Sequence, residues 1–217
     1  AMAFDIHDFD GPFFERHGLE RLRALLAEGG RKTVPAEGVR LGPPVARPGK
    51  IVCLGKNYAD HAAEFDAQLP DSPILFSKAT TAIIGPADPI VLPAGAAEVD
   101  TEAELALVIG RRTKGVSESE AMRHVAGLTI LNDVTDRKAQ REGKQWFRGK
   151  SCDTFCPLGP WLVTLDETGD PHGLRFGDEL LADAARLALG ELSNCYGNPL
   201  TLTGLDGATQ TTLDMLD

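Results

Sequence analysis

The sequence predicts a β-rich α+β domain, because its apolar segments are short, its turn residues are frequent and its helix-like stretches are few. The apolar runs are bounded by Pro, Gly or Asp, as the strands of a folded sheet commonly are. Helical periodicity appears in only a few places between them. Strands with few intervening helices favour an α+β architecture over a regular alternation of strands and helices.

The expected elements follow in chain order. Leucines at helical spacing predict a helix over residues 18–29, ended by two glycines. Residues 31–49 are rich in Pro, Gly and Arg and predict a loop, so we divide the chain into an N-terminal segment and linker (1–48) and a main domain (49–217). Strands are expected at 51–54, 74–76, 81–84, 89–92, 101–109, 126–134 and 161–165. Helices are expected at 57–68, 117–124, 137–143 and 178–192.

Length and charge restrict the class of protein. A chain of 217 residues with 42% hydrophobic residues suits one large domain, or one domain with a small appendage. A formal net charge of −10 argues against nucleic acid as a partner, because phosphates would be repelled. No apolar run could span a bilayer, and the N-terminus lacks the apolar core of a signal peptide. We therefore expect a cytoplasmic protein with no membrane partner, and four reduced cysteines.

One predicted strand carries three acidic residues at alternate positions, Asp100, Glu102 and Glu104. Alternate side chains share one face of a strand, with Cα atoms roughly 7 Å apart, so these carboxylates would repel one another without a cation between them. A solvated strand face is the simpler alternative. Ala106 and Val108 continue the same face as apolar residues, however, and this favours a buried metal site.

A second acidic position follows another apolar strand, at Asn132-Asp133. Asp133 is a natural third oxygen ligand for Mg²⁺ or Mn²⁺, which accept carboxylates together with water and substrate oxygens. Taken alone, the pair would be better explained as a turn or a helix cap.

Two further patterns suggest catalysis. His61 and Glu64 lie three residues apart on a predicted helix face, where Glu64 could orient His61 as a base, although such pairs are usually surface ion pairs. Lys150 lies among aromatic residues and glycines, and could hold a carboxylate or a developing enolate. The alternative interpretation of Lys150 is a lysine that extends into solvent from an irregular loop.

Four segments in chain order resemble the fumarylacetoacetate hydrolase family. They are residues 50–64 (KIVCLGKNYADHAAE), 100–110 (DTEAELALVIG), 132–140 (NDVTDRKAQ) and 149–160 (GKSCDTFCPLGP). The resemblance implies a mixed β-roll that assembles as a homodimer. Residues 145–164 look most similar to the branch of diketo-deoxy-sugar-acid hydrolases and ureidoglycolate lyase-like proteins, whereas the tail (177–217) does not match the family.

The resemblance also assigns roles. The implied metal ligands are Glu102, Glu104 and Asp133. The implied catalytic residues are the water-activating pair His61 and Glu64, together with Lys150. The implied substrate-binding residues are Lys56, Tyr58, Arg137 and Gln140.

The function we expect is hydrolysis of a C–C bond in a small 1,3-dicarbonyl oxo-acid, with Mg²⁺ or Mn²⁺ as the cofactor. Decarboxylation of oxaloacetate, or an isomerisation or hydration, would use the same metal and enolate chemistry. A non-catalytic scaffold with an incomplete pocket is the alternative from another class, since the tail departs from the family. A metal-dependent aldolase also needs such a site, but the order of the motifs argues against it.

Overall fold

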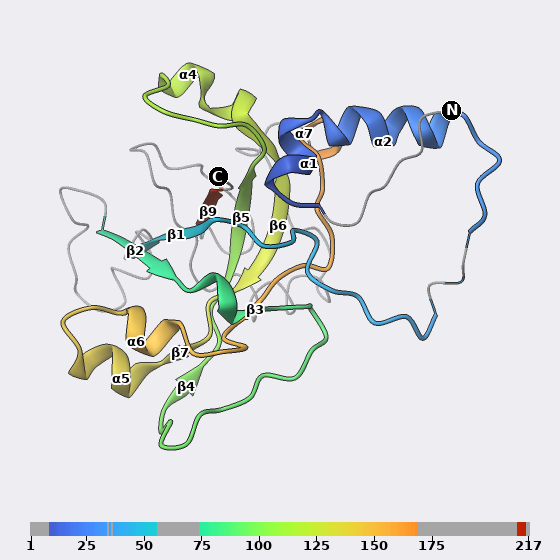
Figure 1. The fold of residues 1–217 in the computed structure, drawn as a ribbon. Helices are drawn as coiled ribbons and strands as arrows, with labels where there is room; N and C mark the ends of the chain where they lie inside the picture. Colours follow the sequence, from blue (N-terminus) through green and yellow to red (C-terminus); the bar gives the residue numbers. More distant parts are fainter. Residues whose placement is uncertain (1–8, 34, 36, 56–73, 169–211, 216–217) are drawn as a thin grey trace.

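The structure of this chain is a computed structural model that describes residues 9–33, 35, 37–55, 74–168 and 212–215. A five-stranded mixed sheet, in the order β2-β1-β9-β5-β6, forms its centre (Figure 1). Its strands are β1 (Lys50–Gly55), β2 (Ile74–Lys78), β5 (Ala103–Ile109), β6 (Val125–Asn132) and β9 (Thr212–Met215). The β-rich α+β class predicted from the sequence is therefore confirmed.

The chain order of these strands determines how the sheet is assembled. β1 pairs with β2, and β5 with β6, each in antiparallel orientation. β9 lies between the two pairs, antiparallel to β1 and parallel to β5. A segment near the C-terminus thus occupies the middle of the sheet.

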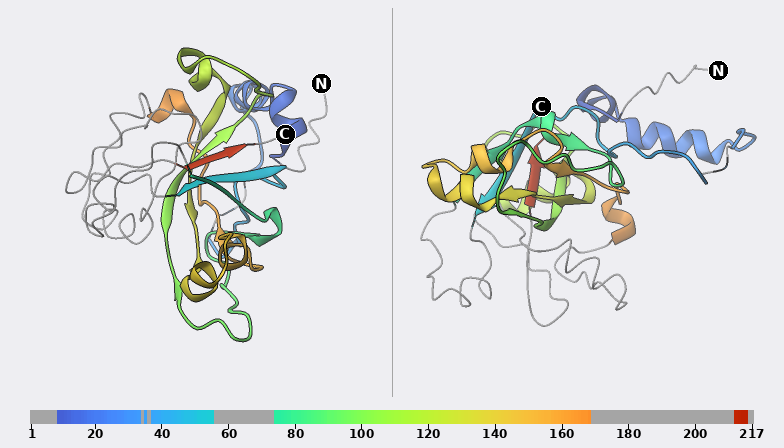
Figure 2. Two further views of the ribbon diagram at one scale, coloured as in Figure 1. Left: turned by 90° about the vertical axis from the view of Figure 1, so that its left-hand side faces the viewer. Right: turned by 90° about the horizontal axis from the view of Figure 1, so that it is seen from below.

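Smaller elements cover one end of the sheet, which is the lower part of Figure 1. β4 (Val99–Asp100) pairs with β7 (Thr135–Asp136), and β3 (Ile83–Ile84), which follows the 3-10 turn η1 (Thr80–Ala82), pairs with β8 (Cys156–Pro157). The helices α5 (Arg137–Glu142) and α6 (Phe147–Lys150) lie beside these strands, as both views in Figure 2 show. This end of the sheet holds the acidic residues singled out above.

Helices gather at the opposite end. They are α1 (Gly11–Glu15), α2 (Gly18–Ala27), α4 (Glu118–Ala121), the 3-10 turn η2 (Met122–His124) and α7 (Leu165–Thr168). α1 begins where the Asp10 carboxylate accepts a hydrogen bond from the Phe13 N–H at 3.1 Å, which satisfies a donor of the first turn. α1 then packs Phe13 and Phe14 into the core.

β5 is buried on both faces. From Leu105 to Ile109 no residue is more than 6% exposed, so the strand reads as a continuous apolar run. Each fully buried leucine there contributes about 1.5–3 kcal/mol. The buried apolar segment therefore fixes the position of β5 in the core, and with it the polar residues that lie at each end of the strand.

The predicted elements agree with the structure in most places. The expected helix at 18–29 is α2, that at 117–124 is α4 with η2, and that at 137–143 is α5. The expected strands at 51–54, 74–76 and 126–134 are confirmed as β1, β2 and β6, whereas that at 81–84 is η1 followed by the short β3. The expected helices at 57–68 and 178–192 lie outside the described residues.

Two expectations were wrong. Residues 89–92 form no strand, because the Val91 N–H donates to the Thr154 hydroxyl at 2.8 Å and not to a neighbouring strand. Residues 161–165 make only one bridge, between Val163 and Leu128, before α7 begins at Leu165. The strand expected at 101–109 is confirmed as β5, which starts two residues later, at Ala103.

The structure also bears on the cysteines and on membrane-spanning segments. Cys53, Cys152 and Cys156 carry free thiols. Among the described helices, none combines the length and the apolar character needed to cross a bilayer.

Candidate metal centre

Three buried carboxylates meet where the start of β5 lies beside the end of β6. Glu102, Glu104 and Asp133 are 3%, 1% and 0% exposed, and each offers an oxygen within 4.8 Å of the others. The antiparallel pairing of β5 with β6 places Glu104 opposite Leu131, two residues before Asp133. The cluster predicted from alternate acidic positions and a strand end is therefore assembled by strand pairing.

Asp100 does not join this cluster. It belongs to β4, where it pairs with Thr135, and its side chain is 62% exposed. Of the three acids expected on one strand face, Glu102 and Glu104 are therefore buried in the cluster, whereas Asp100 lies at its exposed edge, where it shares the Arg137 guanidinium with Glu102.

The ammonium group of Lys150 lies inside the cluster. Its Nζ donates to Glu102 Oε2 at 2.7 Å, to Asp133 Oδ2 at 2.6 Å and to Thr135 Oγ1 at 2.9 Å. The residue is 2% exposed, and Nζ lies 4.9 Å from the centre of the Phe76 ring, a cation–π contact. Lys150 is thus a buried partner of the carboxylates, which contradicts the alternative of a surface lysine.

A second buried lysine, Lys78, was missed by the sequence analysis. It ends β2 and is 1% exposed. Its Nζ donates to Asp133 Oδ1 at 2.6 Å and to Val134 O at 3.3 Å, and it also donates to the Lys150 carbonyl oxygen. Strand alternation places Lys78 on the same face as Ile74 and Phe76, a signal that could have identified it.

Arg137 joins the cluster at its edge. It begins α5, whose first turn is capped by Asp136, and its side chain is 29% exposed. The guanidinium contacts Glu102 Oε1, Asp100 Oδ2 at 3.2 Å and Gln140 Oε1 at 3.4 Å. Arg137 and Gln140, both predicted to bind substrate, therefore lie together beside the carboxylates. His61, Glu64, Lys56 and Tyr58 lie outside the described residues.

These contacts hold the buried groups in their charged forms. Burial opposes ionisation of Asp133, but the charges of Lys78 and Lys150 outweigh it and hold the pKa of Asp133 below its usual range. Burial likewise opposes the charge on Lys150, yet the nearby carboxylates, Asp133 foremost, raise the pKa of Lys150 well above its ordinary value. Lys150 is therefore a persistent cation and hydrogen-bond donor, not a base.

The donor set is suited to a hard divalent cation. Three carboxylates within 4.8 Å offer the oxygen ligands that Mg²⁺ and Mn²⁺ accept, and their burial excludes competing water. Lys78, Lys150 and Arg137 reduce the repulsion among the carboxylates, which allows three acids to remain buried at short range. Glu102, Glu104 and Asp133 are the residues that could hold the ion.

Comparison with known proteins agrees with this site. Residues 50–203 match the family described as Fumarylacetoacetate (FAA) hydrolase C-terminal. The chain belongs to this family. The matched span contains all the carboxylates and cations of the candidate metal centre, and it extends beyond residue 176, where the sequence resemblance was expected to end. The domain boundaries and the placement in one branch of the family stay predictions.

Among its relatives, the mitochondrial oxaloacetate tautomerase FAHD2A of Bos taurus is 53% identical over 144 residues, which are 65% of this chain and 46% of that protein. A solved structure of 5-carboxymethyl-2-hydroxymuconate delta-isomerase from Mycobacterium smegmatis matches with a TM-score of 0.56 and 49% identity, over 62% of this chain and 53% of that one. Fumarylacetoacetate hydrolase from Exiguobacterium antarcticum matches with a TM-score of 0.56 and 41% identity, over 69% and 57%. The chain spans about half the length of the curated relatives it matches.

Proposed function

We propose that this chain is a divalent-metal-dependent enzyme that interconverts the keto and enol forms of a small dicarbonyl acid such as oxaloacetate. The observation that carries the proposal is the buried set of Glu102, Glu104 and Asp133 with the Lys150 ammonium among them. Relatives named as oxaloacetate tautomerases and hydroxymuconate isomerases support this type of reaction.

The residues of the candidate metal centre and the His61/Glu64 pair have different roles in the proposed reaction. A divalent cation, when bound to the carboxylates, would act as a Lewis acid at the substrate carbonyl. Lys150, held in its charged form, uses its three N–H groups on Glu102, Asp133 and Thr135, and would turn one of them to the oxygen on which negative charge develops when a carboxylate is engaged by the cation instead. Arg137, which is partly exposed at the edge of the cluster, would bind the substrate carboxylate. His61, oriented by Glu64, would move the proton at the carbon between the carbonyls.

Metal binding and turnover test the proposal separately. Calorimetry with Mn²⁺ should show a binding site that Glu102→Gln abolishes. The enol absorbance of oxaloacetate should relax faster with the metal-loaded protein, and Lys150→Met should slow this by about 100-fold or more. Glu142→Gln, a change of an exposed glutamate on α5, is the matched control and should leave both measurements unchanged.

A negative result in the binding measurement and one in the turnover measurement would contradict different parts of the proposal. Wild type that binds no Mn²⁺ would contradict the metal centre. Folded, metal-loaded protein that does not act on any oxo-acid would support the alternative of a non-catalytic scaffold.

Hydrolysis of a C–C bond in an acylpyruvate is the second candidate. The similarity to the Exiguobacterium antarcticum hydrolase and the His61/Glu64 pair in the sequence favour it. Hydrolysis requires an activated water, whereas tautomerisation and decarboxylation of oxaloacetate do not. His61→Ala should therefore abolish turnover of acetylpyruvate; equal turnover by this variant and wild type would contradict the hydrolase proposal.

Assembly and location also stay proposals. We propose a homodimer, which light scattering of the purified chain would test. We propose the cytoplasm as its location, although several relatives are named as mitochondrial proteins, and microscopy of a tagged chain would distinguish the two compartments.

A further inference from the structure

A groove of about 590 Å³ lies at the end of β5 opposite to the metal centre. Its walls come from α1 and α2 on one side, from the turn after β5 and the start of β6 on another, and from the start of α7 on a third. Gly110 lies about 20 Å along β5 from Glu104, given the rise of a strand. The groove is therefore distinct from the carboxylate cluster, and its volume lies in the range of about 300–1,000 Å³ typical of small-molecule sites.

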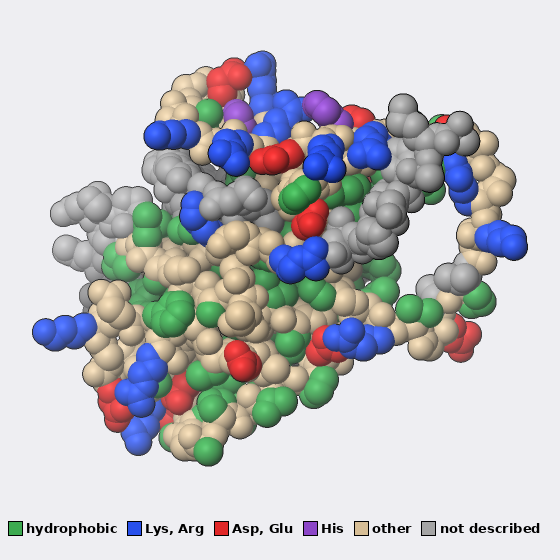
Figure 3. Space-filling view, viewed as in Figure 1, with side chains coloured by type: hydrophobic (Ala, Val, Ile, Leu, Met, Phe, Trp, Pro, Cys, Tyr) green, Lys and Arg blue, Asp and Glu red, His purple; other side chains and the backbone are tan. Residues whose placement is uncertain are grey.

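Arginines converge on this groove from separate elements: Arg23, Arg111, Arg112 and Arg123. Figure 3 shows blue arginine and lysine side chains and purple histidines along the upper rim of the molecule, above a largely tan and green surface. The chain as a whole carries a net charge of −10. Three acidic side chains, Glu15, Glu20 and Asp166, also line the groove, so an anion is attracted here only by an arginine that none of them neutralises.

Two of the three acidic side chains of the groove pair with arginines, and the third lies beside a histidine. Glu15 lies 3.8 Å from Arg112, Glu20 lies 3.8 Å from His17, and Asp166 lies 2.6 Å from Arg23. Arg123 pairs with Glu120 at 2.9 Å.

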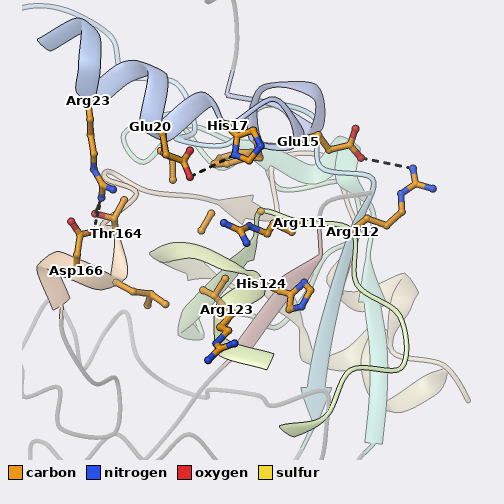
Figure 4. Close-up of a pocket in the computed structure, with 16 residues that line it drawn as sticks. Glu15, His17, Glu20, Arg23, Arg111, Arg112, Arg123, His124, Thr164 and Asp166 are labelled. Atoms are coloured by element: carbon orange, nitrogen blue, oxygen red, sulfur yellow. Dashed lines mark hydrogen bonds and ion pairs between the residues drawn. The ribbon is translucent and has the colours of Figure 1, made fainter. Parts of the chain in front are cut away.

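Arg111 differs from these arginines. In the described part of the chain no carboxylate lies within ion-pair distance of its guanidinium. Figure 4 shows Arg111 between the Arg23–Asp166 pair on one side and the Arg112–Glu15 pair on the other. Its five N–H donors are fixed in a planar fork that suits phosphate and carboxylate oxygens.

The groove also has an apolar side and a buried polar atom without a partner. Phe14, Leu19 and Ala126 line it and pack against the core cluster of the protein. His124 lines it as well, and its Nδ1 is buried without a hydrogen-bond partner among the described residues. Buried polar groups normally have such a partner, so an unpaired one beside an open groove is consistent with a ligand site.

We propose that this groove binds a small organic anion with at least two negative charges and an apolar body. The anionic group binds Arg111, the groove arginine without a carboxylate partner among the described residues, and the body packs against Phe14 and Leu19. Phosphate and paired carboxylates share this chemistry. The site does not depend on the metal or on the proposed reaction, because no carboxylate of the metal centre lines it.

Calorimetry with 1-naphthyl phosphate in EDTA tests the proposal. The wild-type chain should bind it saturably at one site, and Arg111→Gln should weaken binding by about tenfold or more, since a hydrogen-bonded charge pair is lost. Arg111→Lys should restore part of the affinity. Arg31→Gln, an exposed arginine paired with Glu28 outside the groove, is the matched control and should bind as wild type does.

Further probes separate the parts of the proposal. Inorganic phosphate, which lacks the apolar body, and 1-naphthoate, which has one charge, should each bind more weakly than 1-naphthyl phosphate. Absence of saturable binding, or equal affinity in Arg111→Gln of unchanged thermal midpoint, would overturn the site. Equal affinity for inorganic phosphate would overturn the apolar part. Glu102→Gln should bind the probe normally; its failure to do so would place the ligand in the metal centre instead.

Discussion

Two ion pairs in this molecule have the same length but different surroundings. Lys78 Nζ lies 2.6 Å from Asp133 Oδ1 with both side chains fully buried. Arg23 Nη2 lies 2.6 Å from Asp166 Oδ1 with the side chains 54% and 67% exposed. The first pair belongs to the metal centre and the second to the groove at the opposite end of the sheet.

The comparison teaches that distance alone does not determine what an ion pair contributes. Water and salt screen the exposed pair, and each partner is well solvated when the other is removed. In the buried pair, removal of one partner leaves a charge without solvent or counter-charge. The metal centre should therefore be sensitive to substitution and the groove tolerant of it.

Lys78→Met should have the largest effect on stability. The change leaves Asp133 with one cation in place of two, and we expect the free energy of unfolding to fall by about 3–5 kcal/mol. Urea denaturation in EDTA measures this. Lys114→Met, which changes an exposed lysine, is the matched control and should stay within about 0.5 kcal/mol of wild type. A decrease of less than about 1 kcal/mol in the free energy of unfolding of Lys78→Met would contradict the claim that the buried pair is the more sensitive one.

Asp133→Asn should cost about 3 kcal/mol at neutral pH, because it removes the buried carboxylate that pairs with Lys78 and one of the two that pair with Lys150. The folded pKa of Asp133 lies below the unfolded value of about 3.9, so its contribution is full above that value and is lost as the pH falls through the folded pKa. Urea denaturation between neutral and acidic pH should therefore show the two proteins converging as the pH falls. A difference in the free energy of unfolding between the two proteins that grows as the pH falls would contradict the predicted pH dependence.

Gly149→Ala should have an intermediate effect. A Cβ at Gly149 would lie 2.8 Å from Asp136 O and 2.8 Å from Gln140 N, which are backbone atoms that cannot rotate away. We expect a loss of about 1–3 kcal/mol and weaker Mn²⁺ binding, since α6 must move and carries Lys150 with it. Gly42→Ala is the control, because nothing lies within 4 Å of the added Cβ. Unchanged thermal midpoint and Mn²⁺ affinity in Gly149→Ala would show that α6 adjusts freely.

Arg23→Gln should have the smallest effect. We expect a loss of about 0.2–1 kcal/mol, which decreases further in 1 M salt because the pair is exposed. A double-mutant cycle with Asp166→Asn isolates the pair itself. A coupling energy comparable to that of the buried pair would show that burial is not the deciding difference.

Local patterns and the family resemblance together predicted much of the candidate metal centre. The alternation of Glu102 and Glu104 and the position of Asp133 at a strand end made the three carboxylates candidates, and the resemblance selected them. The position of Lys150 was also identified. Its role as a buried counter-ion was not, because that depends on α6 packing against β7, which no local pattern shows.

The errors of the sequence analysis share a physical cause. Lys78 lies 55 residues from Asp133 in sequence, and it reaches the site because β2 packs against α6 in the folded chain. Asp100 was expected to extend the buried acidic face, but it lies in β4, which pairs with β7 and not with β6, and such a change of partner leaves no mark in a run of alternating residues. Residues 161–165 have the composition of a strand, but only Val163 finds a partner, and strand formation needs a partner as well as propensity.

The position of β9 has a consequence for how the protein is made. Lys50 pairs with Met215 and Ala106 pairs with Thr212, so residues 212–215 connect two strand pairs that have no other direct pairing among the described strands. A nascent chain can form the β1–β2 and β5–β6 pairs during synthesis, since domains begin to fold from their N-terminal parts. The two pairs remain separate, with open edges that other chains could join, until residues 212–215 have been translated. Nascent chains that stall before this point would therefore need protection from aggregation that the finished protein does not.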